Sequence, residues 1–205
     1  MLSVVIQAGG ESSRMGADKG LLPFLGQPLV QRVLERLSPL ASEVLVTTNH
    51  PQAYTFLGAR LQTDLLPGRG ALGGLYTALS CACQPYVAVV ACDMPFANPA
   101  LLALTQAALR QNYYDLAIPR TSGGLEPFHA VYRRETCLPR VLAALEAGKR
   151  RVDAWFSEVN MHMIPPEVWQ QIDPEGLAFW NVNTPDELHQ AEGKALAMEE
   201  SSRNS

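Results

Sequence analysis

The segment 7–20, QAGGESSRMGADKG, follows a short apolar run and carries Arg14 and Lys19 among small residues. Glycines let a backbone approach a ligand closely, and successive free N–H groups form a concave site for anions. The two cations would add full positive charge to such a loop. The segment therefore predicts a phosphate-binding loop.

This segment matches neither of two common phosphate-binding motifs. Five residues separate Gly10 from Gly16, where the phosphate loop of P-loop NTPases has four, and Ala17-Asp18-Lys19 follows. The dinucleotide fingerprint G-x-G-x-x-G is also absent. The alternative is an ordinary flexible connection, but such connections usually have only about 2–6 residues. A functional loop of another type is favoured.

Asp93 follows the most continuous apolar run, 86–92 (YVAVVAC). A carboxylate at the end of a buried strand is well placed to hold Mg²⁺, which prefers one or two carboxylates together with substrate phosphate oxygens. The alternative is that Asp93 caps the next turn or helix. We therefore take Asp93 as the candidate metal ligand.

Three further segments carry polar groups that could bind a ligand. Asp64 opens the glycine-rich segment 64–74 (DLLPGRGALGG), and its carboxylate could accept two bonds from a base edge or a ribose. The segment 148–152 (GKRRV) could bind phosphate through arginine, and two Asn two residues apart in 181–185 (NVNTP) could clamp a polar ligand. The alternative for 64–74 is a tight turn rich in glycine, and the alternative for the basic run is a solvated surface.

The sequence shows no nucleophile beside an activating base. No G-x-S-x-G elbow is present, the four His are isolated, and the four Cys complete no zinc site and are expected to be reduced thiols. A glycine-rich loop, two cations and a strand-end Asp without a nucleophile favour phosphoryl or nucleotidyl transfer, in which positioning and charge do most of the work.

These groups require a scaffold that brings strand ends together. Short apolar runs predict strands at 3–8, 43–48, 60–63, 86–92, 115–119, 127–133 and 159–164. Amphipathic patterns predict helices at 28–37, 72–83, 99–110, 135–147 and 185–197, with a short one after Pro51. The alternation predicts an α/β fold, a single Rossmann-like three-layer domain with a mostly parallel sheet. Ligands then bind beyond the carboxyl ends of its strands.

Composition restricts the class of protein. The chain has 205 residues, 47% hydrophobic and 18% charged, which suffices for one core over 1–192, with a flexible tail expected at 193–205. The net charge of −4 disfavours nucleic acid as a partner. No apolar run approaches the ~18–20 residues that cross a bilayer, and the N-terminus lacks the features of a signal peptide. We expect no membrane association and a cytoplasmic location.

The combined motifs resemble the molybdenum cofactor guanylyltransferase (MobA) family. They are AGGESSRMGADK at 8–19, CDMPF at 92–96, EPFHAVYRR at 126–134, GKRRV at 148–152 and NVNTPDEL at 181–188. The resemblance extends over about residues 3–192 and implies a nucleotide-diphospho-sugar transferase-like fold. Gln7 stands where the family usually has Leu, the segment 70–74 departs from its Gly-Pro-Leu-Ala-Gly turn, and 50–60 shows no match.

The resemblance implies a reaction and its ligands. The family transfers GMP from GTP to the terminal phosphate of molybdopterin, or the molybdenum cofactor, with Mg²⁺, and releases pyrophosphate. Molybdoenzyme apoproteins and other cofactor-synthesis proteins would be further partners. A cytidylyltransferase for molybdopterin, a nucleotidyltransferase for another small phosphorylated substrate and a binding protein without catalysis are the alternatives.

The resemblance also implies roles for individual residues. The catalytic group would be Arg14, Lys19 and Asp93, with Mg²⁺ on Asp93. The nucleotide-binding group would be Gln7, Ala8, Gly9, Gly10, Lys19, Asn49, Asp64 and Asp93. The group that binds the pterin substrate would be Arg151, Asn181 and Asn183.

Overall fold

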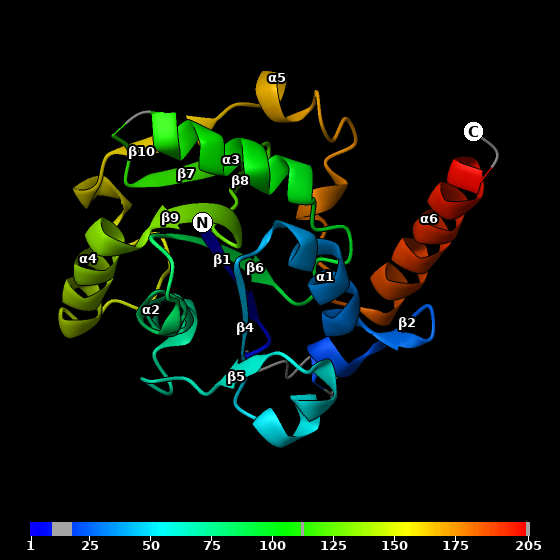
Figure 1. Ribbon diagram of the computed structural model, residues 1–205, viewed down its shortest axis with the longest axis horizontal. Helices are drawn as coiled ribbons and strands as arrows, with labels where there is room; N and C mark the ends of the chain where they lie inside the picture. The colour runs from blue at the N-terminus through cyan, green and yellow to red at the C-terminus, as the bar shows by residue number, and fades with distance from the viewer. Residues whose placement is uncertain (10–17, 112, 204–205) are drawn as a thin grey trace.

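A single mixed sheet forms the centre of the computed structural model, which describes residues 1–9, 18–111 and 113–203 (Figure 1). The strand order is β10-β7-β9-β6-β1-β4-β5, with β8 paired to β7. Its strands are β1 (Leu2–Gln7), β4 (Glu43–Thr47), β5 (Arg60–Gln62), β6 (Tyr86–Ala91), β7 (Leu116–Thr121), β8 (Gly124–Leu125), β9 (His129–Arg133) and β10 (Met161–Ile164). A separate antiparallel pair joins β2 (Pro23–Phe24) to β3 (Gln27–Pro28).

The sheet is mostly parallel, as the alternation of strands and helices predicts. The pairs β5–β4, β4–β1, β1–β6 and β7–β10 are parallel. Strand β9 runs antiparallel to both of its neighbours, β6 and β7. The carboxyl ends of the parallel strands therefore meet at one edge, and β9 begins at that same edge.

Helices cover both faces of this sheet and give three layers. The α-helices are α1 (Leu29–Leu37), α2 (Gly70–Cys81), α3 (Pro99–Gln111), α4 (Arg134–Glu146), α5 (Pro166–Trp169) and α6 (Pro185–Arg203). The 3-10 turns are η1 (Lys19–Leu21), η2 (Ser38–Leu40), η3 (Pro51–Leu57), η4 (Phe156–Glu158) and η5 (Leu177–Phe179). Figure 1 shows α2 and α4 on one side of the sheet and α1 and α3 on the other.

Alternation along the buried strands explains the two faces. Val5 in β1 packs in a core with α2 and α4, whereas Val4 and Ile6 pack in a second core with α1 and α3. Successive side chains of a strand point to opposite faces, so a strand covered on both sides is apolar at almost every position. The strands and helices expected between 3 and 164 lie within two residues of their observed bounds.

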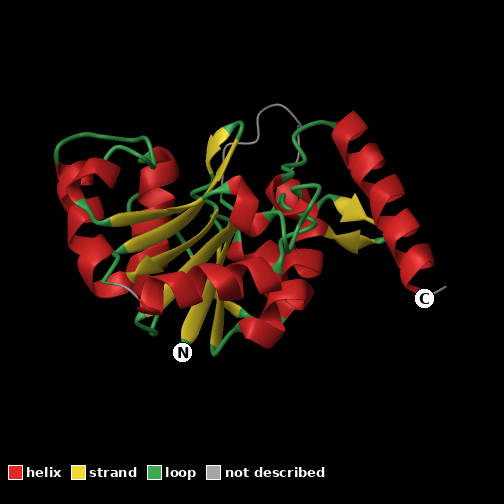
Figure 2. Cartoon of the chain, turned by 90° about the horizontal axis from the view of Figure 1, so that it is seen from above, coloured by secondary structure: helices red, strands yellow, loops and turns green. Residues whose placement is uncertain are grey.

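The C-terminal helix is longer than the helix expected at 185–197. Helix α6 continues to Arg203 and lies beside the β2–β3 pair, outside the layers of the sheet (Figure 2). Ala195 is buried against Phe24 and Phe96, and the backbone N–H of Leu25 donates to Glu192 Oε1 at 2.8 Å. Residues 193–203 are rich in strong helix formers, and this apolar contact holds the helix in place.

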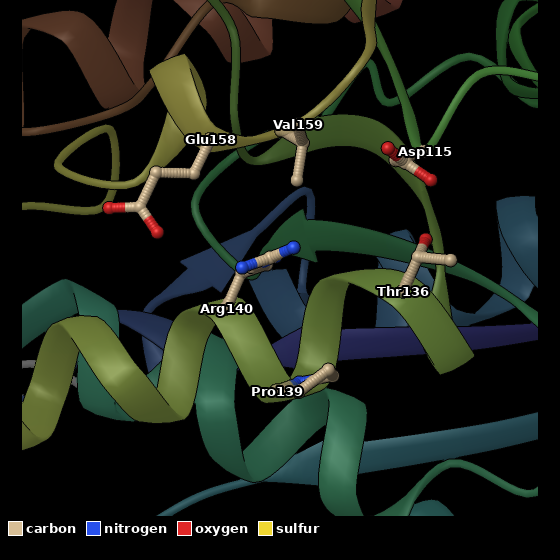
Figure 3. Close-up of a pocket in the computed structure, with 6 residues that line it drawn as sticks. All are labelled: Asp115, Thr136, Pro139, Arg140, Glu158 and Val159. Atoms are coloured by element: carbon tan, nitrogen blue, oxygen red, sulfur yellow. The ribbon is translucent and has the colours of Figure 1, made fainter.

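A cavity of about 380 Å³ opens at the edge opposite the carboxyl ends of the parallel strands. Figure 3 shows its lining, in which Asp115 and Val159 precede β7 and β10. The other lining side chains are Thr136, Pro139 and Arg140 of α4, and Glu158. This cavity is separate from the edge that carries the predicted site.

None of the helices within 1–9, 18–111 and 113–203 has the length and apolar character of a membrane-spanning segment.

Candidate active site

Backbone hydrogen bonds continue the sheet past the ends of its central strands. The N–H of Ala8 donates to Thr47 O at 2.8 Å, and the N–H of Cys92 donates to Gln7 O at 3.0 Å. On the other side, the N–H of Thr48 donates to Gln62 O at 2.9 Å. These bonds align the ends of β1, β4, β5 and β6, so the residues that follow all emerge at one edge.

Lys19 links two of the predicted site residues at this edge. Its Nζ lies 3.0 Å from Asp93 Oδ2 and 2.7 Å from Asn183 Oδ1. The side chain of Asp93 is 14% exposed and that of Lys19 is 21% exposed. A partly buried ammonium, carboxylate and amide therefore form one cluster, although they come from three distant parts of the chain.

A tyrosine that sequence reasoning missed holds the turn that carries Lys19. Tyr54, in η3, is fully buried and donates its hydroxyl hydrogen bond to Asp18 Oδ1. Burial and this carboxylate raise the pKa of Tyr54, so its hydroxyl stays protonated. Asp18 also accepts from the N–H of Gly20 at 3.2 Å, and a Cβ at Gly20 would lie 2.6 Å from the Tyr54 hydroxyl. Only the tertiary contact reveals this role, because residues 50–60 matched no motif.

Tyr54→Phe is expected to lower kcat about 3- to 10-fold with little change in fold. The variant removes one hydrogen bond, worth about 1.5–3 kcal/mol when its partner is charged, and loosens the turn that aims Lys19. Steady-state pyrophosphate release measures kcat, and thermal unfolding measures the fold. Tyr132 is also buried, but its hydroxyl donates to the backbone carbonyl of Pro127 and it lies in the opposite core, so Tyr132→Phe provides the control. Equal kcat in Tyr54→Phe and wild type would contradict this positioning role.

Asn183 is held by the start of α6. The backbone N–H of Val182 donates to Asp93 O at 2.9 Å, which fastens this segment to the end of β6. Glu187 Oε2 accepts from the N–H groups of Asn183 and Thr184, while Thr184 Oγ1 accepts from the N–H of Glu187 at 3.2 Å. This is a reciprocal capping box, and it fixes the backbone from which Asn183 reaches Lys19.

A second group forms where β4 and β5 end. Asn49 Nδ2 donates to Asp64 Oδ2 at 3.4 Å. A Cβ placed on Gly9 would lie 3.7 Å from that amide and 3.9 Å from that carboxylate. Burial raises the pKa of Asp64, an effect that the bond from Asn49 partly offsets. The structure therefore brings together three residues that the sequence assigned to the nucleotide.

Gln7 ends β1 beside α2. Its Nε2 is buried and finds no hydrogen-bond partner in the described part of the chain. A Cβ on Gly74 would come within 3.2 Å of its Oε1 and 3.3 Å of its Nε2, so the missing side chain of Gly74 leaves room for this amide. A buried donor without an acceptor is costly, and it is suited to a ligand that supplies one.

The side chains of two residues expected on the pterin side do not join these groups, although the backbone carbonyl of Asn181 accepts from Asn183 Nδ2 at 3.3 Å. The Arg151 side chain is 83% exposed and forms an ion pair with Asp153 at 2.8 Å. Asn181 Nδ2 donates to Phe179 O at 3.1 Å, so it does not form a clamp with Asn183, which faces Lys19. Gly10 and Arg14 lie outside the described residues.

The arrangement suits two anionic substrates that meet at a charged centre. Lys19 supplies a cation, Asp93 a carboxylate, and Asn49 with Asp64 a donor and acceptor pair at one side. No group of three metal-ligating side chains occurs within the described ranges. Asp93 alone still fits Mg²⁺, because this ion commonly takes one or two carboxylates and completes its shell with water and phosphate oxygens.

The family described as "MobA-like NTP transferase domain" matches residues 4–161. The chain belongs to this family. A "Probable molybdenum cofactor guanylyltransferase" from Chloroflexus aggregans is 41% identical over 198 residues, 92% of each chain. A "Molybdenum cofactor guanylyltransferase" from Desulfosudis oleivorans is 31% identical and covers 94% of this chain and 95% of its own. This MobA-like NTP transferase is thus similar to these relatives along nearly its whole length.

Solved structures agree with the fold of the MobA-like NTP transferase. The molybdopterin-guanine dinucleotide biosynthesis protein A from Archaeoglobus fulgidus superposes with a TM-score of 0.83 at 28% identity, over 95% of this chain and 99% of that chain. A nucleotidyl transferase from Methanothermobacter thermautotrophicus gives a TM-score of 0.72 at 16% identity, over 97% and 99% of the two chains. The expected nucleotide-diphospho-sugar transferase-like fold is confirmed.

Proposed function

We propose that this MobA-like NTP transferase transfers GMP from GTP to the terminal phosphate of molybdopterin and releases pyrophosphate. The observation that carries the proposal is the cluster of Lys19, Asp93 and Asn183 at the sheet edge, beside the pair of Asn49 and Asp64. Relatives named for this activity match over most of the chain. A GTP-binding, magnesium-dependent nucleotidyltransferase of molybdenum cofactor biosynthesis accounts for both.

The base and the phosphates would occupy the two groups separately. Asp64 would accept N–H bonds from guanine, since its half-buried carboxylate has only one side-chain donor, Asn49, among the residues described. Gly9, which is exposed and has no side chain, would let the nucleotide approach the backbone next to the buried Ala8. Lys19 would then bind the phosphates, and Asn183 would keep its ammonium in place.

The transfer needs no covalent enzyme intermediate. An oxygen of the molybdopterin phosphate forms a bond to the α-phosphorus of GTP, and the bond to the β-phosphate oxygen breaks, so pyrophosphate carries away the electron pair. The attacking phosphate is already largely ionised at pH 7, because its second pKa is about 6, so no strong base is required. Lys19 would stabilise the charge on the leaving group.

Asp93 is the residue that would hold Mg²⁺. When bound, the ion would offset negative charge on the phosphate oxygens. The same carboxylate pairs with Lys19 Nζ at 3.0 Å. To bind the pterin substrate, Arg151 would have to release Asp153, and Asn181 would have to release Phe179 O. Delivery to molybdoenzyme apoproteins or other cofactor-synthesis proteins, and a cytoplasmic location, stay predictions.

A thermal-shift comparison of GTP, CTP, ATP and UTP tests the proposal, each with and without Mg²⁺. We expect a selective shift with GTP that Mg²⁺ increases. A ligand that binds only the folded state at a hundred-fold excess over Kd adds about 2.7 kcal/mol to the free energy of unfolding. A selective shift with CTP would instead identify a cytidylyltransferase.

The variant Asp64→Asn tests the role of the carboxylate in guanine recognition, because it keeps the size of the side chain and removes its charge. The variant should reduce the preference for GTP over the other nucleotides. A shift of equal size with all four nucleotides in the wild-type protein would contradict guanine recognition. Pyrophosphate release with GTP and molybdopterin then separates an enzyme from a nucleotide-binding protein.

A further inference from the structure

Glu126 carries a half-buried carboxylate at the same edge of the sheet as Asp93. Because β9 is antiparallel to β6, its first residue, His129, pairs with Val90 near the carboxyl end of β6. The ladder continues one step further, where the N–H of Ala91 donates to Phe128 O at 3.3 Å. Glu126 comes just before this point and Asp93 just after it, so both emerge at the end of the same pair of strands.

The backbone and one hydroxyl fix Glu126 in place. Its N–H donates to Pro119 O at 3.0 Å, and its carbonyl accepts from the N–H of His129 at 3.0 Å. Thr121 Oγ1 lies 2.8 Å from Glu126 Oε1. No cation of the described ranges forms an ion pair with this carboxylate, and burial raises the pKa of Glu126. Among the described residues, Oε2 of this carboxylate has no hydrogen-bond partner and is available to a ligand.

The strand order places Glu126 on the side of Asp93 away from the nucleotide residues. Strand β6 is central, with β1, β4 and β5 on one side and β9 and β7 on the other. Asn49 and Asp64 follow β4 and β5, whereas Glu126 precedes β9. In the transfer reaction, two substrates meet at the charged centre formed by Lys19 and Asp93. If GTP binds on the β4–β5 side, the acceptor substrate binds on the β9–β7 side.

Guanine and pterin carry the same recognition edge, a 2-amino-4-oxopyrimidine with a ring N–H beside an amino group. A carboxylate accepts from both of these donors at once, because its two oxygens lie side by side. Asp64 and Glu126 have matching surroundings: each is a half-buried carboxylate with one neutral side-chain donor, Asn49 or Thr121. The pair of carboxylates on opposite sides of Asp93 fits two substrates that share this edge.

We propose that Glu126 binds the pterin ring of the acceptor substrate by accepting its ring N–H and 2-amino group. This inference rests on the proposed function, since it takes molybdopterin as the acceptor. Glu126 is then a specificity-determining residue for the second substrate, and Asp64 has the corresponding place for the first.

Glu126→Gln tests the proposal through the two KM values. The amide keeps the size of the side chain but replaces one acceptor by a donor, which opposes the donors of the pterin. We expect the KM for molybdopterin to rise about 10- to 100-fold and the KM for GTP to stay within about two-fold. Glu158→Gln, at the opposite edge (Figure 3), is the matched control and should change neither KM.

A binding measurement separates ring recognition from a purely structural role. Fluorescence quenching gives the Kd of a pterin monophosphate and of its lumazine counterpart, in which an oxo group replaces the 2-amino group. The wild-type protein should prefer the pterin about 10-fold or more, and Glu126→Gln should lose this preference. A wild-type protein without the preference, or a variant that keeps it, would overturn the inference.

The two proposals fail in different ways. If the wild-type protein releases no pyrophosphate from GTP and molybdopterin, the proposed function is wrong. If transfer occurs but Glu126→Gln leaves the KM for molybdopterin unchanged, only the assignment of Glu126 is wrong. The comparison of pterin with lumazine can be made on the wild-type protein. If that protein shows no preference for the pterin, the assignment of Glu126 is overturned even when Glu126→Gln fails to fold.

Discussion

Asp93→Ala is expected to reduce GTP-dependent pyrophosphate release to below about 1% of the wild-type rate, a loss of the size seen when one preorganised electrostatic group is removed. The variant deletes the carboxylate that would hold Mg²⁺ and that pairs with Lys19 at 3.0 Å. It also leaves that ammonium without its anionic partner at the reaction centre. A coupled assay for pyrophosphate measures the rate at saturating Mg²⁺, GTP and molybdopterin.

The fold should survive this change. The segment that leads to α6 is fastened to the backbone carbonyl of Asp93, which accepts from Val182, and not to its carboxylate. Asp93→Asn keeps a similar shape and an oxygen for Lys19 but removes the charge, and it should be nearly as inactive. Glu175→Ala, which removes an exposed carboxylate from its ion pair with Lys194, is the control and should stay active. An active Asp93→Ala enzyme would contradict the metal assignment.

Lys19→Ala is expected to lower kcat about 10²–10³-fold, the effect of removing one donor worth about 3–4 kcal/mol in the transition state. The ammonium lies between Asp93 Oδ2 and Asn183 Oδ1, where it would face the phosphates and the leaving pyrophosphate. Single-turnover kinetics with saturating GTP measure this loss. The KM for GTP should change less than kcat, because the charge on the leaving group develops during the reaction.

Lys19→Arg restores the charge but not the shape, since a planar guanidinium cannot replace an ammonium between two close acceptors. It should recover part of the activity, and Lys149→Ala, at an exposed ion pair with Glu158, should keep all of it. A kcat for Lys19→Ala within about three-fold of wild type would show that the cluster is structural only.

Local sequence patterns were sufficient to predict most of the helices and strands. The uninterrupted apolar run of β6 identifies a strand covered on both faces, and Asp93 at its end follows directly. Strand β5 and helix α2 similarly place Asp64 at a strand end, where its burial raises the pKa. Side-chain period and turn residues are properties of short segments, so they can be recognised without knowledge of the rest of the chain.

Local patterns do not show where packing between distant segments extends an element. The helix expected at 185–197 continues to Arg203, and its Ala195 packs against Phe24 and Phe96. This contact has no local signal, since a helical face has the same sequence appearance whether or not a partner meets it.

The pattern of strands and turns along the chain is enough to show which residues stand at strand ends and therefore share one edge of a parallel sheet. Contacts between these residues follow from the packing of distant elements. Lys19 and Asn183 lie 164 residues apart, and Tyr54 reaches Asp18 from a turn that matches no motif. Periodicity fixes the direction of a side chain within its own element, whereas contact between elements depends on how their faces pack together.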